Sequence, residues 1–69
     1  MKSEELVIVS ATSAALGAAM HQAGLSTGNR WLDVGLGVVV TAAGYLSNYD
    51  GLSDAVEGFG VGIVLDSIL

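Results

Sequence analysis

The uncharged stretch from Leu6 to Leu25, LVIVSATSAALGAAMHQAGL, decides the expected fold. Twenty residues in a helix span about 30 Å, the thickness of the hydrocarbon core of a bilayer. A soluble helix of this length normally carries a charged face, and this stretch has none. Glu4 and Glu5 precede it, which suits the positive end of a helix and is atypical of the basic start of a signal peptide. We therefore expect a retained membrane-spanning helix over residues 4–25.

A polar turn at residues 26–30 separates this helix from a second one, expected over 31–49. The turn is short enough to make the second helix an antiparallel neighbour of the first. Trp31 lies at one end of the second segment, and Tyr45 and Tyr49 lie at the other. Interfacial aromatic residues occupy these positions on a spanning helix, so the first two segments are predicted to form a transmembrane hairpin.

A second turn, at 50–52, leads to a third helix over 53–69. Its first half is amphipathic, and Asp66 follows its apolar second half. Acidic side chains cost about 2.5–3.5 kcal/mol at the centre of a bilayer and much less near the ends of a span. This helix is expected to start at the interface and to enter the membrane or a protein-lined space. The predicted fold is all-α: one small membrane domain, residues 1–69, with an antiparallel transmembrane helical hairpin and a third, partly amphipathic C-terminal helix.

The composition excludes several classes of function. The chain is acidic, with a net charge of −5 and two cations, so it lacks the basic surface of a nucleic-acid-binding protein. It has no Cys and one His, so we expect neither a disulfide nor a metal site. The glycine-rich stretches lack the strand–turn–helix context of a nucleotide-binding loop. We expect no enzyme activity, no cofactor and no small-molecule substrate.

Each predicted helix carries a stripe of small residues at helical spacing. The members are Ser10, Ala14 and Gly17 in the first helix, Gly37, Thr41 and Gly44 in the second, and Ala55, Gly58 and Gly62 in the third. Burial alone does not drive helices together in lipid, whereas small faces let backbones approach closely. We interpret the stripes as helix-packing interfaces. The alternative is that they only reflect a composition rich in Ala and Gly.

A second arc of small residues adjoins the first stripe and indicates assembly. Its members are Ala11, Ala15, Ala18 and Ala19, while Val9, Leu16 and Met20 remain for lipid. One neighbouring helix cannot use both small arcs. We therefore expect copies of this chain, other membrane subunits, or both as partners.

His21 is the one side chain here of a type that titrates near neutral pH. The plainer interpretation is a polar residue near the membrane surface. The alternative is a polar pair: if the third helix runs antiparallel to the second, Asp66 returns to the same side of the membrane as His21. An ionisable pair within a membrane is a functional-site hypothesis.

In length, hydropathy and small-residue content the chain resembles the hydrophobic hairpin coat proteins of lipid-containing viruses. It lacks the mid-membrane carboxylate that the rotor-ring subunits of proton-driven ATP synthases carry. We expect a non-catalytic structural or accessory subunit of a membrane assembly, integral to a cell membrane or a virion membrane. Two alternatives stay open: a small pore-forming protein of holin or channel type, and a soluble helical oligomer whose partners cover the apolar faces.

Overall fold

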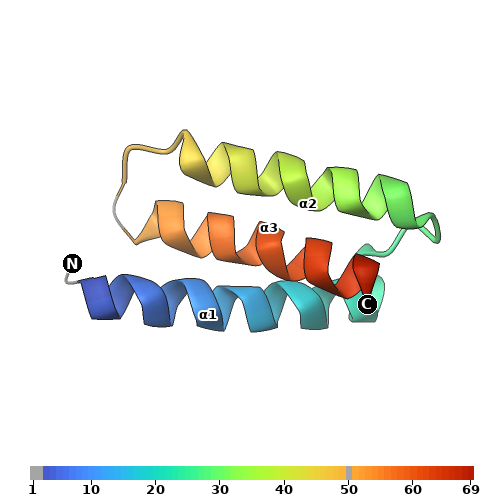
Figure 1. Ribbon diagram of the computed structural model, residues 1–69, viewed down its shortest axis with the longest axis horizontal. Coiled ribbons are helices and arrows are strands. Elements are labelled where there is room, and N and C mark those ends of the chain that lie inside the picture. The colour runs from blue at the N-terminus through green and yellow to red at the C-terminus, as the bar shows by residue number, and fades with distance from the viewer. Residues whose placement is uncertain (1–2, 50) are drawn as a thin grey trace.

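Three helices make up most of the chain in the computed structural model, which describes residues 3–49 and 51–69 (Figure 1). They are α1 (Ser3–Met20), α2 (Arg30–Tyr45) and α3 (Leu52–Ile68), and a π-helical segment, η1 (His21–Leu25), continues α1. The all-α class expected from the sequence is confirmed. Residues 1, 2 and 50, the last of which belongs to the predicted second turn, lie outside the described residues.

α3 lies between the other two helices. α1 and α2 run antiparallel, and each packs on α3, but they do not pack on each other within residues 3–49 (Figure 1). The prediction that the first two helices are direct neighbours is therefore wrong. The physical reason is that α3 offers glycines on two of its faces, so both neighbours approach it at backbone distance.

The connection between α1 and α2 is built from short polar residues and two glycines. Gly24 leaves the helical dihedrals (φ 176°, ψ −7°), and the helix ends just beyond it. Gly28 then turns the chain with a φ of 84°, in the left-handed region that favours glycine. The Asn29 side chain accepts hydrogen bonds from the backbone N–H groups of Trp31 and Leu32, at 3.0 and 3.4 Å. Asn29 is thus the N-cap that starts α2.

α2 ends at Tyr45, whereas the sequence predicts a helix that continues to Tyr49. The backbone N–H of Ser47 turns back to the Gly44 carbonyl at 3.0 Å. The Ser53 hydroxyl of α3 donates to the same carbonyl at 2.6 Å. Ser and Asn side chains compete for backbone groups and favour turns over helix interiors, which explains the early end. When η1 is counted as the continuation of α1, the other helix boundaries lie within one residue of the predicted ones.

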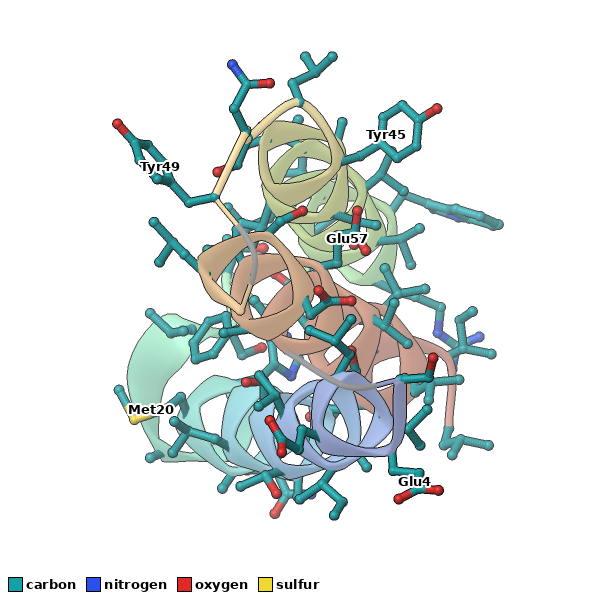
Figure 2. All side chains as sticks on the ribbon, turned by 90° about the vertical axis from the view of Figure 1, so that its left-hand side faces the viewer. Glu4, Met20, Tyr45, Tyr49 and Glu57 are labelled. Atoms are coloured by element: carbon teal, nitrogen blue, oxygen red, sulfur yellow. The ribbon has the colours of Figure 1, made fainter. Side chains whose placement is uncertain are left out.

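The distribution of side chains is inverted relative to that of a soluble domain. Among the described residues, Ile63 is the one large apolar side chain that is buried, at 1% exposure. The other buried residues are glycines and two polar residues, His21 and Asp33. Large apolar side chains such as Val7 and Val39 stay exposed, and side chains project outward from all three helices (Figure 2). Apart from Ile63, the interior of the described part of the chain is made of backbone, glycine and polar groups, and many of the large apolar side chains lie outside.

Candidate functional site

The stripes of the first and third predicted helices meet in one contact, the α1–α3 seam: Ser10, Ala14 and Gly17 on α1, and Gly58 and Gly62 on α3. A Cβ atom added at Gly58 would overlap the backbone carbonyl of Ser10, and one at Gly62 would overlap that of Ala14. A Cβ atom added at Gly17 would overlap the backbone of Phe59. The two helices therefore touch at backbone distance. Ala55, predicted for the same stripe, is half-buried.

The stripe of the second helix packs on a different face of α3, and we call this contact the α2–α3 seam. A Cβ atom added at Gly37 would lie 2.8 Å from the carbonyl oxygen of Gly60, and one at Gly44 would lie 2.9 Å from that of Ser53. Both distances are shorter than real Cβ atoms allow. The Thr41 hydroxyl donates to the Gly37 carbonyl at 2.9 Å, so its polar group is satisfied within its own helix.

Gly60 was not among the predicted packing residues, although it is buried against Thr41 and Gly37. It shares a helical face with Ser53, Glu57 and Val64, and the intervals of three and four residues are those of the predicted stripes. Because Glu57 and Val64 are not small, this face does not stand out in the sequence. α3 therefore has two packing faces, one for each neighbour.

A polar cluster lies at the end of the bundle where α1 and α3 end and α2 begins (Figure 1). We define it as His21, Asp33 and Asp66. His21 lies between the two carboxylates: its Nε2 is 3.0 Å from Oδ2 of Asp33, and its Nδ1 contacts Oδ2 of Asp66. His21 and Asp33 are 5% and 3% exposed. The structure thus brings together His21 and Asp66, the pair considered from the sequence, and adds Asp33.

Ser26 and Thr27, in the connection between α1 and α2, complete the hydrogen bonding of Asp33. Its Oδ1 accepts from the Thr27 hydroxyl at 2.7 Å and from the Thr27 backbone N–H at 2.8 Å. Its Oδ2 accepts from the Ser26 hydroxyl at 3.0 Å. These three donors favour the charged form of Asp33, because hydrogen bonds to a carboxylate stabilise the anion.

The other two members of the cluster also have neutral partners. Gln22 donates from its side-chain amide to Oδ1 of Asp66 at 2.6 Å. The Ser67 hydroxyl lies 3.4 Å from Nε2 of His21 and donates to the carbonyl of Ile63 at 2.7 Å. No buried side-chain nitrogen or oxygen within residues 3–49 and 51–69 lacks a hydrogen-bond partner. The cluster is therefore fully satisfied, as buried polar networks usually are.

Asp33 was missed because its partners come from separate parts of the chain. The available signal was that Asp33 is the one carboxylate between Trp31 and Tyr49, in the first helical turn, where the helix dipole favours an anion. That signal explains a charged residue at a helix start. It does not indicate that the turn and the end of α1 fold over the carboxylate, which depends on the bend at Gly24 and the packing of α3.

Ser67, His21 and Asp66 have the residue types of a catalytic triad, but the geometry does not provide a general base. In such a triad the imidazole Nε2 accepts the proton of the hydroxyl. Here Nε2 of His21 already contacts Asp33 at 3.0 Å, and the Ser67 hydroxyl is directed to a backbone carbonyl. The two carboxylates also lie on opposite ring nitrogens, so one metal ion could not bind all three side chains. No three His, Asp or Glu residues in the described part of the chain could hold a metal ion.

The predicted interfacial aromatic residues are all exposed. Trp31 and Tyr45 lie at opposite ends of α2, with 78% and 76% of their surface exposed. Tyr49 lies in the connection after α2 and not on the helix, because α2 ends early. Tyr45 and Tyr49 extend away from the bundle at its end near the start of α3 (Figure 2). The aromatic side chains are therefore at both ends of the molecule and available for contacts outside the chain.

One helix among the described residues, Ser3–Leu25, is long and apolar enough to cross a membrane, with a mean hydropathy of 1.3. A signal sequence near the N-terminus and the core helix of a soluble protein meet the same criteria. Only 11% of the most apolar 18-residue stretch of this helix is buried, whereas the core helix of a soluble protein is mostly buried. α2 and α3 have 16 and 17 residues and are too short for this criterion, so the second span of the predicted hairpin is not found.

Neither seam nor the polar cluster forms a sequence pattern typical of one protein class. Small residues at helical spacing occur wherever helices pack closely, and a His between two carboxylates occurs in structural networks as well as in functional sites. Comparison of the chain with known protein families, with curated proteins and with solved structures gives no match.

Proposed function

We propose that the chain is a non-catalytic subunit of a membrane assembly, inserted in the bilayer as a three-helix unit. The observation that carries this proposal is the inverted distribution of side chains. In water, burial of apolar surface stabilises a fold by about 25 cal/mol per Å². A chain that buries Ile63 and leaves Leu16, Leu32 and Val39 at 54%, 62% and 65% exposure gains little from that source.

Lipid removes this difficulty. Because lipid tails are as apolar as leucine, exposed Val, Ile and Leu cost nothing there, and helices associate through close backbone packing and hydrogen bonds. The two seams and the polar cluster supply those interactions. The described residues extend 37 Å along their longest axis, enough to cross a hydrocarbon core of about 30 Å.

The second arc of small residues on α1 supports partners within the membrane. Ala11, Ala15 and Ala19 remain exposed after α3 has packed on the neighbouring stripe. This surface would admit another helix closely, from a second copy or from a different subunit. A large membrane complex and the membrane or coat of a lipid-containing virus would both use such a subunit.

A pore-forming role has less support. A pore requires polar groups along its whole length, whereas the buried polar side chains among the described residues, His21 and Asp33, belong to the cluster at one end. The interior between the helices is occupied by glycine and backbone contacts.

Extraction of vesicle-bound protein with alkaline carbonate tests the proposal. The full chain should stay in the membrane pellet, float with lipid on a density gradient and dissolve only in detergent. Its native mass in mild detergent should then exceed that of one chain. Release by carbonate would overturn the membrane location and favour a soluble oligomer. Leakage of a small dye from vesicles that contain only this protein would overturn the structural role in favour of a pore.

A matched pair of variants makes the insertion test specific. Leu16→Arg places a charge on the exposed apolar side of α1 and should oppose insertion by about 2.5–3.5 kcal/mol, which shifts the chain toward the soluble fraction. Asn48→Arg places the same charge in the exposed connection after α2 and should leave fractionation unchanged. Equal behaviour of the two variants would contradict the proposed orientation of α1 toward lipid.

A further inference from the structure

His21 joins the end of the first helical segment to α2, although α1 and α2 do not otherwise pack together within the described residues. Within the described residues α1 and α2 each pack on α3 and not on each other. At the end of the bundle, however, Nε2 of His21 contacts Asp33 of α2 and Nδ1 contacts Asp66 of α3. One imidazole ring therefore connects the end of the first helical segment to both other helices.

With Asp33 and Asp66 both ionised, the geometry requires a proton on each ring nitrogen. A carboxylate oxygen can only accept a hydrogen bond, and both ring nitrogens of His21 face one. A neutral imidazole has one N–H and one lone pair, so one of the two contacts would set a lone pair against a carboxylate oxygen. The doubly protonated ring donates in both directions and offsets one of the two negative charges.

Among residues 3–49 and 51–69, no other charged group takes part in these contacts. The titratable groups that face His21 are Asp33 from α2 and Asp66 from α3, and the α1 end contributes the neutral Gln22. The ion pairs within residues 3–49 and 51–69 are the two that His21 makes. The side chain of Asp66 is 15% exposed, and Gln22 beside it is exposed, so water reaches the edge of the cluster.

We propose that His21, Asp33 and Asp66 form a proton-binding site that works as a latch between the three helices. With the proton bound, the imidazolium holds the start of α2 and the end of α3 against the end of α1. When the proton leaves to water, two carboxylates face a neutral ring, one contact becomes repulsive, and the end of the bundle opens. The glycine seams do not titrate, so the middle of the bundle stays packed in both states.

The unique histidine makes the protonation state directly measurable. The full chain, labelled with ¹⁵N at histidine, is placed in dodecylphosphocholine micelles and studied by NMR as the pH is raised. The two ring nitrogens should resonate alike while the ring is an imidazolium, and the pH at which their signals separate should lie above the midpoint of a free imidazole, about 6.5. Separation at or below that midpoint, with the bundle folded, would overturn the proposal without any variant.

Opening should accompany loss of the proton. The Thr27 amide, which donates to Asp33, should exchange with solvent faster once the histidine signal reports the neutral ring. Amides of the α1–α3 seam, such as that of Ala14, should keep their protection after correction for the general effect of pH on exchange. Uniform loss of protection along the chain, or no change at Thr27, would contradict a latch.

Single-carboxylate variants provide the quantitative test. Asp66→Asn and Asp33→Asn each remove one negative partner and should weaken proton binding by His21 roughly tenfold or more, since a nearby opposite charge shifts such equilibria by that amount. Asp54→Asn removes an acid of α3 that makes no contact with His21, and proton binding should stay unchanged. Equal titration of the Asp66→Asn variant and the parent would overturn the assignment.

Discussion

The middle of the bundle and its polar end achieve close helix contact in opposite ways. In the middle, Gly58 and Gly62 meet the backbone of α1 because no side-chain atom stands between them. At the end, His21 and its two carboxylates fill the space between the helices with charged hydrogen bonds. The middle should therefore fail when atoms are added and ignore pH, whereas the end should fail when a charge is removed and respond to pH.

The largest effect is expected from added bulk in the α1–α3 seam. The double variant Gly58→Leu/Gly62→Leu introduces side chains where a single Cβ atom already overlaps the backbone of Ser10 and Ala14. Overpacking costs about 1–3 kcal/mol for each site, so about 2–6 kcal/mol for the pair. Unfolding in SDS, followed by circular dichroism, should shift by that amount. An unchanged transition would show that α1 and α3 do not approach this closely.

A smaller, pH-dependent effect is expected at the polar end. His21→Gln leaves Asp33 and Asp66 without their shared cation, so the variant should melt below the parent at neutral pH, by less than the glycine pair. The difference should shrink at acid pH, because protonation of a carboxylate relieves the repulsion that the variant creates.

Second-site rescue distinguishes charge from packing at the same position. His21→Gln/Asp66→Asn removes one carboxylate as well and should recover part of the lost Tm at neutral pH. Asp54→Asn in the same background, away from the cluster, should recover nothing. Rescue by neither or by both would mean that His21 acts by shape alone.

The extent of the helices could be predicted from the sequence because it depends on local features. The charge-free run that begins at Leu6, the acidic residues before it and Gly24 near its end identify α1 without knowledge of its partners. The early end of α2 was missed because it depends on Ser53 of another helix, whose hydroxyl binds the Gly44 carbonyl at 2.6 Å.

The arrangement of the helices could not be predicted in the same way. The small stripes identify faces that can approach another backbone, but a stripe does not say which helix it meets. The short first turn suggested direct pairing of α1 and α2. The second face of α3, with Gly60 against Thr41, makes α3 the common partner instead. His21 and Asp66 could be paired by helix direction alone, while Asp33 required the fold of the turn.

A moderate and local effect is expected at the start of α2. Asn29→Ala removes the acceptor for the Trp31 and Leu32 N–H groups and should cost about 1 kcal/mol, within the range for loss of an N-cap. Faster hydrogen exchange should be confined to the first turn of α2. Asn48→Ala, in the exposed connection after α2, is the matched control and should change neither stability nor exchange.

The smallest effect, with the opposite sign, is expected at Gly35. This residue lies inside α2, is exposed, and a Cβ atom added there would meet nothing within 4 Å. Gly35→Ala therefore adds a methyl group without overlap and reduces the conformational freedom that the chain loses on folding. The gain should be about 0.5–1 kcal/mol in the same SDS unfolding experiment.

Gly35→Ala also separates contacts within the chain from contacts between chains. If the single-chain unit is more stable but its native mass in mild detergent falls, a neighbouring subunit packs against Gly35, and this glycine belongs to an interface outside the chain. If stability rises and the mass is unchanged, Gly35 faces lipid. Loss of stability comparable to that of the Gly58/Gly62 variant would contradict the comparison itself, because an open glycine and a seam glycine would then respond alike.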